Sequence, residues 1–385
     1  MKLNLKIFIT LFFAVFVATV GVGLVAPLLP VYAHELGAGA FQIGLIFAAF
    51  SLTRSLFVPY FGRLSDHRGR KRFLGAGLFL YFVLSLLYVY LKDVNVLILL
   101  RLGQGFASAM IFPVAQSYVG ILTPMGKEGR IMGLFNMSLY GGLSVGPLLG
   151  GILKDWFSIQ ASFLSMSSLT LIGFLLCLLF LPKESIPRKG AVQDRKEPLG
   201  YRQLLMSPKV FPLFAFRTCL TTCSGITWTF IPFMASTMLG LSSTAIGMIV
   251  TINVLLSGLL QAPMGYIADR FSKKILVTSG GILAMLSIVY LMIASSFGEL
   301  FLANGLLGLA GGVSFPAIMA LGVIEGRRTE AMGSLMGLLA MGHSLGMLVG
   351  PLLAGLCIDL FSIETIFVLG ALIAGVGTFV YLRQS

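Results

Sequence analysis

Long apolar runs separated by short polar loops dominate the chain. Each run is long enough to cross a hydrocarbon layer, which needs roughly 20 apolar residues per helix. We predict twelve spans, at 7–33, 41–61, 73–91, 95–121, 131–152, 159–182, 210–238, 243–264, 276–296, 300–323, 331–356 and 364–382. Backbone groups in lipid must bond within their own segment, and no long alternating pattern indicates strands. The predicted fold class is therefore an all-α membrane protein.

The sequence contains an internal repeat about half a chain long. Several signatures return at an offset of 203 or 204 residues: Gly62-Arg-Leu-Ser-Asp66 as Gly265-Tyr-Ile-Ala-Asp269, Phe112-Pro113 as Phe315-Pro316, and Gly146-Pro147 as Gly350-Pro351. Such a duplication is typical of transporters that rock one half against the other around a central site. We expect two pseudo-symmetric six-helix bundles, at 1–182 and 210–385, joined by a cytoplasmic linker at 183–209. A regulatory docking segment is the alternative reading of that linker.

Composition identifies lipid as the solvent. Hydrophobic residues make up 57% of the chain and charged residues 11%, with a mean hydropathy of +0.97. If the amino terminus is cytoplasmic, 22 of the 27 basic residues fall on the cytoplasmic side, so we expect a multi-pass protein of the cell (inner) membrane with both termini in the cytoplasm. The net charge of +13 then reflects topology and contact with anionic lipid headgroups, and we expect no nucleic-acid partner.

Three motifs carry a resemblance to a known family. They are the loop Gly62-Arg-Leu-Ser-Asp66-His-Arg-Gly69-Arg70-Lys71, the run Arg101-Leu-Gly-Gln104-Gly105 in the fourth span, and Gly142-Leu-Ser-Val-Gly146-Pro147-Leu-Leu-Gly150-Gly151 in the fifth. Together they resemble the signatures of the major facilitator superfamily, and are most similar to its drug/proton antiporter branch. The resemblance covers all twelve spans and implies the major facilitator fold.

The first motif resembles a cytoplasmic latch. The resemblance implies that Asp66 stabilises the outward-facing state, while Gly62 lets neighbouring helices approach and basic side chains form ion pairs. The residues concerned are Gly62, Asp66, Arg70 and Lys71, with a weaker second copy at Asp269 and Arg270. His67 stands where the family commonly has arginine, and Ser272 stands where a second Gly69 would be. A basic anchor that only sets topology is the alternative.

The motif of the fifth span predicts close helix packing. Gly142, Gly146 and Gly150 are spaced by four residues and lie on one helix face, while Pro147 removes one backbone hydrogen bond and permits a bend. Gly350 and Pro351 give a similar arrangement in the eleventh span. The resemblance implies that this motif marks exporters that exchange substrate for protons.

Charges within the spans bear on the substrate. All fourteen acidic residues fall in loops or at span ends, whereas Arg54, Arg101 and Arg217 lie within spans. An intramembrane arginine is costly unless it meets protein, water or an anion. Guanidinium groups suit carboxylates and phosphates, so Arg54 and Arg217 are predicted to bind an anionic or strongly polar group. Snorkelling toward the headgroups is the alternative.

Two further residues are candidates for proton coupling. Arg101 matches the motif of the fourth span, which the resemblance associates with proton coupling, although a structural bond to Gln104 would also explain it. His343 is the only histidine within a span, and its ordinary pKa suits a proton carrier. A neutral histidine bonded to a neighbouring helix is the alternative. The uncharged substrate-binding candidates are Gln104, Tyr140, Trp228 and Asn253.

The sequence therefore predicts a proton-coupled exporter of small amphipathic or anionic molecules that works by alternating access. A facilitator or proton symporter of a metabolite on the same fold is the alternative, followed by a receptor that does not transport. We expect a monomer whose partners are a small-molecule substrate, protons and membrane lipid. We expect no cofactor, because no nucleotide-binding motif is evident, no metal site, and no enzymatic activity, because no catalytic set is evident.

Overall fold

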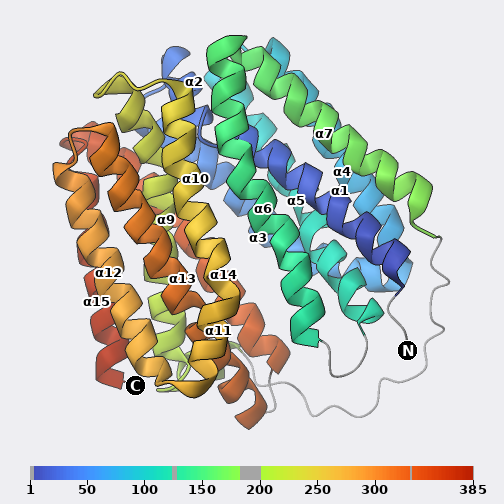
Figure 1. The fold of residues 1–385 in the computed structure, drawn as a ribbon, viewed down its shortest axis with the longest axis vertical. Helices are drawn as coiled ribbons and strands as arrows, with labels where there is room; N and C mark the ends of the chain where they lie inside the picture. Colours follow the sequence, from blue (N-terminus) through green and yellow to red (C-terminus); the bar gives the residue numbers. More distant parts are fainter. Residues whose placement is uncertain (1–3, 124–127, 183–200, 330–331, 385) are drawn as a thin grey trace. The chain divides into compact units, whose positions relative to one another are not determined.

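The computed structural model describes residues 4–123, 128–182, 201–329 and 332–384, and these fold almost entirely into helices (Figure 1). The amino-terminal repeat contains α1 (Leu5–Val25), α2 (Leu29–Glu35), α3 (Ala40–Arg68), α4 (Arg70–Leu87), the short 3-10 helix η1 (Tyr88–Tyr90), α5 (Val94–Leu122), α6 (Glu128–Trp156) and α7 (Ile159–Phe180). After α8 (Tyr201–Leu205), the second repeat contains α9 (Phe211–Thr237), α10 (Ser243–Leu259), α11 (Gln261–Arg270), α12 (Lys273–Ile293), α13 (Phe297–Arg328), α14 (Met332–Leu360) and α15 (Thr365–Gln384). Residues 183–200 of the predicted linker lie outside the described part.

All twelve predicted spans correspond to helices, which confirms the predicted fold class. Three spans are each built from two helices: α1 with α2, α4 with η1, and α10 with α11, the last pair bent by 40° around Leu260. Among the described residues, nine helical segments are long and apolar enough to cross a membrane, or ten with the bent pair. The remaining two long helices are α6 and α9. Helix α9 carries Arg217 and a series of hydroxyl side chains, so its composition is more polar than that of a helix surrounded by lipid.

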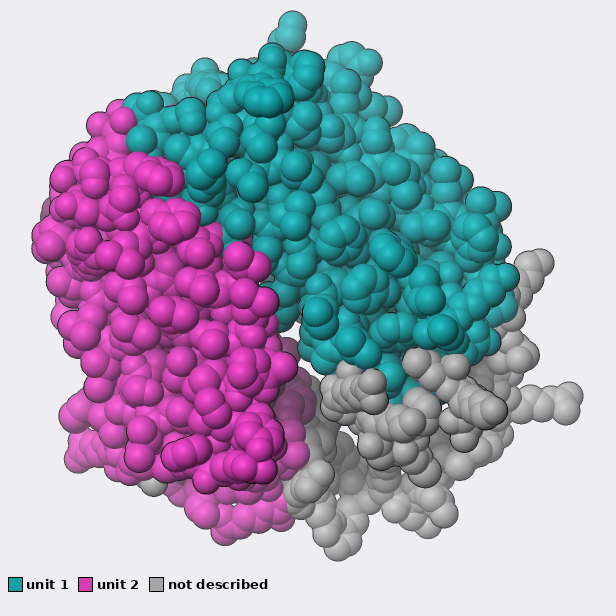
Figure 2. Space-filling model, in the orientation of Figure 1, with its two compact units in different colours: residues 1–38, 49–188, 240–251 teal, residues 39–48, 189–239, 252–385 magenta. Residues whose placement is uncertain are grey.

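The chain forms two compact units, coloured separately in Figure 2. Unit 1 comprises residues 1–38, 49–188 and 240–251, and unit 2 comprises residues 39–48, 189–239 and 252–385. Helix α10 therefore begins in unit 1 and continues into unit 2, while α3 begins in unit 2 and continues into unit 1. Each unit contains mainly one repeat together with the first turns of one helix from the other repeat.

Glycines bring α6 into backbone contact with α1 in unit 1. A Cβ added to Gly142 would overlap the Thr19 hydroxyl, and one added to Gly150 would overlap the carbonyl oxygen of Leu24. A Cβ on Gly146 would lie 2.7 Å from the carbonyl oxygen of Val20, closer than real Cβ atoms come. The predicted packing role of this face therefore agrees with the geometry.

The same contact recurs between α14 and α9 in unit 2. A Cβ on Gly346 would overlap the Thr221 hydroxyl, and one on Gly350 would overlap the carbonyl oxygen of Thr222. Gly225 on α9 in turn lies against the ring of Pro351. The Thr221 hydroxyl donates to the carbonyl oxygen of Gly342 at 3.3 Å, just as Thr19 donates to Ser138 at 3.1 Å in unit 1. The repeat thus preserves one helix pair in both units.

Replacing Gly150 by alanine should destabilise the protein, because the new methyl group has no room beside the α1 backbone. We expect a loss of roughly 1–3 kcal/mol, the usual cost of overpacking, measured as a lower melting temperature in detergent. Gly133→Ala on the same helix is the matched control, since a Cβ there meets no atom of the described residues within 4 Å. Equal melting temperatures for the two variants would contradict this packing argument.

Candidate functional site

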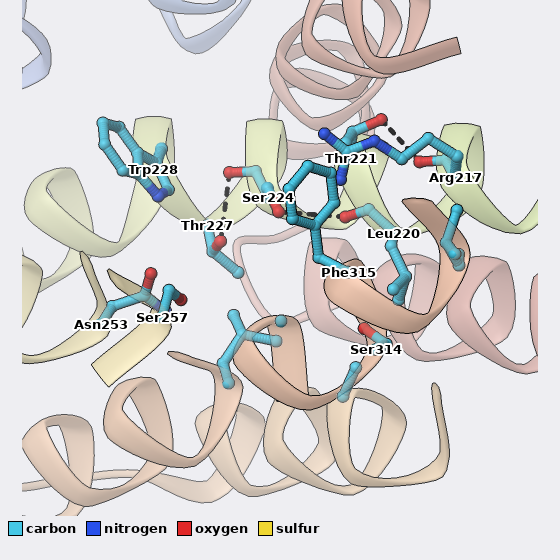
Figure 3. Close-up of a pocket in the computed structure, with 14 residues that line it drawn as sticks. Arg217, Leu220, Thr221, Ser224, Thr227, Trp228, Asn253, Ser257, Ser314 and Phe315 are labelled. Carbon is cyan, nitrogen blue, oxygen red and sulfur yellow. Dashed lines mark hydrogen bonds between the residues drawn. The ribbon is translucent and has the colours of Figure 1, made fainter. Parts of the chain in front are cut away.

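Unit 2 contains a pocket of about 80 Å³ between α9, α10, α12 and α13, lined by both polar and apolar residues (Figure 3). This volume holds several water molecules or the polar head of a ligand. Three of the six predicted substrate-binding residues line it: Arg217, Trp228 and Asn253. The structure therefore brings together one predicted cation, one aromatic side chain and one amide, all within a single unit.

One face of α9 forms a wall of the pocket. Arg217, Thr221, Ser224 and Trp228 follow one another at steps of four, three and four residues, so they share one side of the helix. The row spans about 16 Å at a rise of 1.5 Å per residue. Figure 3 shows Trp228 and Arg217 toward opposite ends of this row, with the hydroxyl side chains between them.

The Arg217 guanidinium is held by contacts from two other helices. Its central carbon lies 4.2 Å from the ring centroid of Phe315 on α13, in cation–π geometry, and a terminal nitrogen lies 3.2 Å from Nδ1 of His343 on α14. Since a guanidinium carries only donors, Nδ1 of His343 is the acceptor in this contact. The alternative prediction for His343 is a neutral histidine bonded to a neighbouring helix. The structure shows such a bond, and its partner is the Arg217 guanidinium of α9.

Asn253 contacts a second amide across the helix pair α10 and α13. Its side-chain nitrogen donates to Asn304, at 3.0 Å to the backbone oxygen and 3.2 Å to the side-chain oxygen. Residues 50 and 101 occupy the equivalent positions of the first repeat, where the Arg101 guanidinium lies 4.4 Å from the ring centroid of Phe50. The same helix contact therefore carries an amide pair in one repeat and a cation–π pair in the other.

Arg101 lies in a buried network in unit 1. It donates to the side-chain oxygen of Gln104 at 3.2 Å, and the same oxygen accepts from the Tyr88 hydroxyl at 2.8 Å. The amide nitrogen of Gln104 is 3.4 Å from the Ser85 hydroxyl. All four side chains are less than a tenth exposed. The predicted structural bond between Arg101 and Gln104 is therefore present, and it directs Gln104 toward protein partners.

Arg54 in unit 1 contacts the same repeat-related phenylalanine position as Arg217 does in unit 2. Its guanidinium lies 5.5 Å from the ring centroid of Phe112, the residue that the repeat relates to Phe315. Arg54 comes from α3 and Arg217 from α9, so different helices bring an arginine to the same aromatic position. Tyr140 lies half-buried on α6, and its backbone oxygen accepts from the Ser144 hydroxyl at 2.6 Å.

The basic part of the predicted latch bonds within unit 1. Arg70 is buried and donates through Nε to the Ser117 hydroxyl of α5 at 3.0 Å. Lys71 donates to the carbonyl oxygens of Leu178, at 2.8 Å, and Leu181. These carbonyls belong to the carboxyl end of α7, where the helix dipole favours a cation. Gly69 has a φ of 92°, a conformation that favours glycine.

The remaining latch residues are less constrained in the structure. The side chain of Asp66 lies outside the described part. A Cβ on Gly62 would meet no described atom within 4 Å, so the close approach expected there is not seen in that part. In the second copy, Asp269 and Arg270 are exposed, and the Arg270 guanidinium stacks 4.2 Å from the ring centroid of Tyr266.

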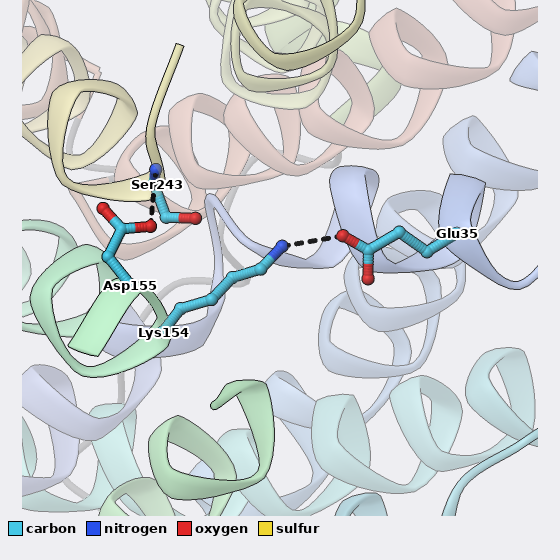
Figure 4. A network of polar contacts seen from close by, with 4 residues as sticks. All are labelled: Glu35, Lys154, Asp155 and Ser243. Carbon is cyan, nitrogen blue, oxygen red and sulfur yellow. Dashed lines mark hydrogen bonds and ion pairs between the residues drawn. The ribbon is translucent and has the colours of Figure 1, made fainter. Parts of the chain in front are cut away.

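Two carboxylates that were not among the predicted site residues, Asp155 and Asp359, cap the amino termini of helices. Asp155, in the last turn of α6, accepts from the backbone N–H groups of Ser243 at 3.0 Å and Thr244 at 2.7 Å, at the start of α10 (Figure 4). Beside it, Lys154 pairs with Glu35 at 2.9 Å. Except for Asp359, these residues lie in unit 1.

The repeat reproduces this cap in unit 2. Asp359, in the last turn of α14, accepts from the backbone N–H groups of Ala40 at 3.1 Å and Phe41 at 3.0 Å, at the start of α3. Neighbouring backbones pack closely in both copies: a Cβ on Gly44 would overlap the carbonyl oxygen of Pro351, and one on Gly247 would overlap that of Pro147. An anion at a helix amino terminus is favourable because it meets unpaired N–H groups and the positive end of the dipole.

Sequence reasoning named Arg217, Trp228 and Asn253 as candidates, but neither Phe315 nor most of the hydroxyls that line the pocket. Ser224, Thr227, Ser257 and Ser314 line the pocket although serine and threonine are common in membrane helices. The periodic placement of small polar residues along 217–228 was the available signal. Among the described residues, no cluster of three metal-ligating side chains occurs.

Replacing Asp155 by asparagine should destabilise the folded protein at neutral pH by roughly 1 kcal/mol, since the exposed carboxylate is partly screened by water. Desolvation raises the pKa of Asp155, but hydrogen bonds from Thr244 and Ser243 together lower it below its usual value. A lowered pKa means that the ionised form stabilises the fold above the ordinary carboxyl pKa, and that this contribution is lost as pH falls. The difference in melting temperature between wild type and Asp155→Asn should therefore stay nearly constant from about pH 7 to about pH 5 and shrink as the pH falls below about 4. A difference independent of pH would contradict the capping role.

Comparison with known proteins gives concordant matches along the chain. A family model described as Major Facilitator Superfamily matches residues 11–238 and 213–385. An uncharacterized MFS-type transporter of Methanocaldococcus jannaschii is 27% identical over 385 residues, covering 99% of each chain. The quinolone resistance protein NorA of Staphylococcus aureus is also 27% identical, over 97% of this chain and 95% of its own.

The fold has solved counterparts as well. A crystal structure of a bacterial homologue of the human lysosomal transporter Spinster matches with a TM-score of 0.83, covering 98% of this chain and 96% of the other, at 14% identity. At this identity the match concerns the fold alone.

Proposed function

The chain belongs to the major facilitator superfamily of membrane transporters, and on that basis we propose that it is a proton-coupled exporter of small amphipathic or anionic organic molecules. The observation that carries the proposal is the pocket of unit 2, where Arg217 shares one cavity with Trp228 and Asn253. A pocket that combines a few convergent polar groups with aromatic and aliphatic walls suits a small amphipathic ligand.

Export is supported by the motif of the fifth span and by a relative. The quinolone resistance protein NorA is named for resistance to a drug, and the glycine face of α6 is the feature by which this chain resembles exporters. We place both termini in the cytoplasm and take bundles 1–182 and 210–385, with the linker 183–209, as the moving parts. We propose a monomer in the cell membrane, in contact with lipid.

Anion recognition rests on Arg54 and Arg217. Each guanidinium stacks on a repeat-related phenylalanine, Phe112 or Phe315, and a stacked guanidinium keeps the positive charge that attracts an anion. Outward movement of one negative charge gains about 2.3 kcal/mol per 100 mV when the inside is negative. We assign Tyr140 a supporting role in binding, and Gln104 an indirect one through its hydrogen bond with Arg101. Asp66, Arg70, Lys71, Asp269 and Arg270 are proposed to bias the conformational states, and Arg101 is proposed to contribute to proton coupling.

Alanine at Arg54 and Arg217 together should reduce uptake of benzenesulfonate into inside-out vesicles by about tenfold or more, since a charge-assisted hydrogen bond contributes about 1.5–3 kcal/mol. Uptake of neutral benzenesulfonamide should change little. Arg202→Ala, an exposed arginine on α8, is the control. Unchanged benzenesulfonate uptake in the double variant would refute the assignment of the two arginines.

A second candidate function, proton symport of an anionic metabolite, is favoured by the contact between Arg217 and His343. Protonation of His343 places a second positive charge 3.2 Å from the guanidinium, and an anion bound at Arg217 reduces that cost. Binding of the anion and of the proton would then promote one another. The carboxylates on α13 and α14 have other partners: Glu325 pairs with Lys209 and Arg328, Glu299 bonds to Ser295, and Asp359 caps α3.

The direction of proton movement separates exchange from symport. During benzenesulfonate uptake into inside-out vesicles, a trapped pH indicator should report protons leaving the lumen for exchange and entering it for symport. In His343→Gln, proton movement should fall to background while benzenesulfonate flux persists. His34→Gln, the corresponding change on α2, is the control. Unaltered proton movement in His343→Gln would reject His343 as the proton carrier.

A further inference from the structure

We propose that the pocket of unit 2 selects anions that also carry O–H or N–H donors, with the anion at Arg217 and the donors along the hydroxyl row of α9 and α10. The inference rests on the proposed function only in taking this pocket as the substrate site. It narrows the substrate class from any amphipathic anion to hydroxylated or N–H-bearing anions.

The hydroxyls of the pocket use their protons within the protein. Each of the five donates to a backbone carbonyl: Thr221 to Arg217 at 2.8 Å, Ser224 to Leu220 at 3.0 Å, Thr227 to Cys223 at 3.1 Å, Ser257 to Gly308 at 2.9 Å and Ser314 to Ala310 at 2.8 Å. A hydroxyl that donates in this way still has lone pairs to accept with. The row therefore presents acceptors, not donors, to a ligand.

Asn253 also presents a hydrogen-bond acceptor to the pocket. Its nitrogen donates to Asn304, which leaves its side-chain oxygen as the group that can accept from a ligand. The donors of the pocket are the Arg217 guanidinium, at one end of the α9 row, and the indole N–H of Trp228 toward the other. A ligand with an anion alone would pair with Arg217 but would cover the acceptor row without donating to it, so the row would lose the hydrogen bonds that water can give.

The polar row is not a requirement of the fold. Aligned through the equivalent residues Thr19 and Thr221, positions 224 and 227 of α9 correspond to Val22 and Val25 at the end of α1, and position 228 corresponds to Ala26, which follows α1. The first repeat forms the same helix pair with these apolar residues. Because the first repeat forms this helix pair without hydroxyls at the equivalents of 224 and 227, the presence of Ser224 and Thr227 in the second repeat points to a ligand.

The fluorescence of Trp228 can test this selectivity directly. The chain has two tryptophans, and Trp156→Phe, at an exposed end of α6, makes Trp228 the sole reporter. Purified full-length protein in detergent would be titrated with 4-hydroxybenzenesulfonate, which has an anion and a donor, and with 4-methoxybenzenesulfonate, which lacks the donor. We expect the hydroxyl compound to bind about fivefold to tenfold more tightly, the equivalent of about one hydrogen bond.

Two variants test which residues cause the preference for the hydroxyl compound. In Ser224→Ala/Ser257→Ala, the affinity for the hydroxyl compound should fall to that for the methoxy compound, while the methoxy affinity stays unchanged. Arg217→Gln should weaken both compounds. Ser279→Ala is the matched control, because Ser279 also donates to its own helix, to Leu276 at 3.1 Å, but lies outside the pocket. Melting temperatures would establish that each variant is folded.

Equal binding of the two sulfonates, or no response of Trp228 to either, would overturn the inference. So would a preference that survives in the double serine variant. The titrations involve no gradient and no flux, so they succeed or fail independently of whether the chain exports, imports or couples to protons. Failure of vesicle transport with intact donor selectivity would count against the proposed function alone.

Discussion

Backbone-to-backbone contact at glycine determines how α9 is oriented, and the candidate site depends on it. Gly346 and Gly350 of α14 leave no room for a side chain beside Thr221 and Thr222, so α9 has a fixed rotation against its neighbour. With that side occupied, the adjacent side of α9, from Arg217 to Trp228, lines the pocket. The same close approach places His343 of α14 within hydrogen-bonding distance of Arg217. A helix pair held apart by larger side chains would provide neither the pocket wall nor the pairing of cation and imidazole.

The internal repeat separates what the fold requires from what the site requires. The pairs of α1 with α6 and of α9 with α14 share glycine contacts and a threonine bond across the pair, so these features belong to the architecture. Where the repeats differ, the side chains at equivalent backbone positions differ in chemistry. Phe50 and Arg101 form a cation–π pair in one repeat, and Asn253 and Asn304 form an amide pair at the same positions in the other. At the equivalents of Ser224 and Thr227 the first repeat carries Val22 and Val25, so those two pocket positions are polar in the second repeat only.

Much of the fold could be predicted from the sequence, because hydrophobic length and basic loops reflect the bilayer directly. All twelve spans were located, and Arg217, Trp228 and Asn253 were identified since charge, indole and amide are rare in such helices. Most of the hydroxyl row was missed, because a serine that donates to its own helix can face either lipid or a cavity. Asp155 and Asp359 were counted only as residues at span ends, since their partners lie about 90 and 320 residues away. Pairings at that separation have no local signature.

The exchanged helix starts make each repeat incomplete by itself. The first turn of α3 finds its carboxylate on α14, and the first turn of α10 finds its carboxylate on α6. If the polypeptide were severed within 183–200 and the fragments produced separately, each would expose one uncapped amino terminus and one orphan aspartate. The two fragments are therefore complementary in their chemistry, and co-expression would restore what either lacks. Each repeat therefore depends on the other for a helix cap, through four backbone N–H groups and two carboxylates in all.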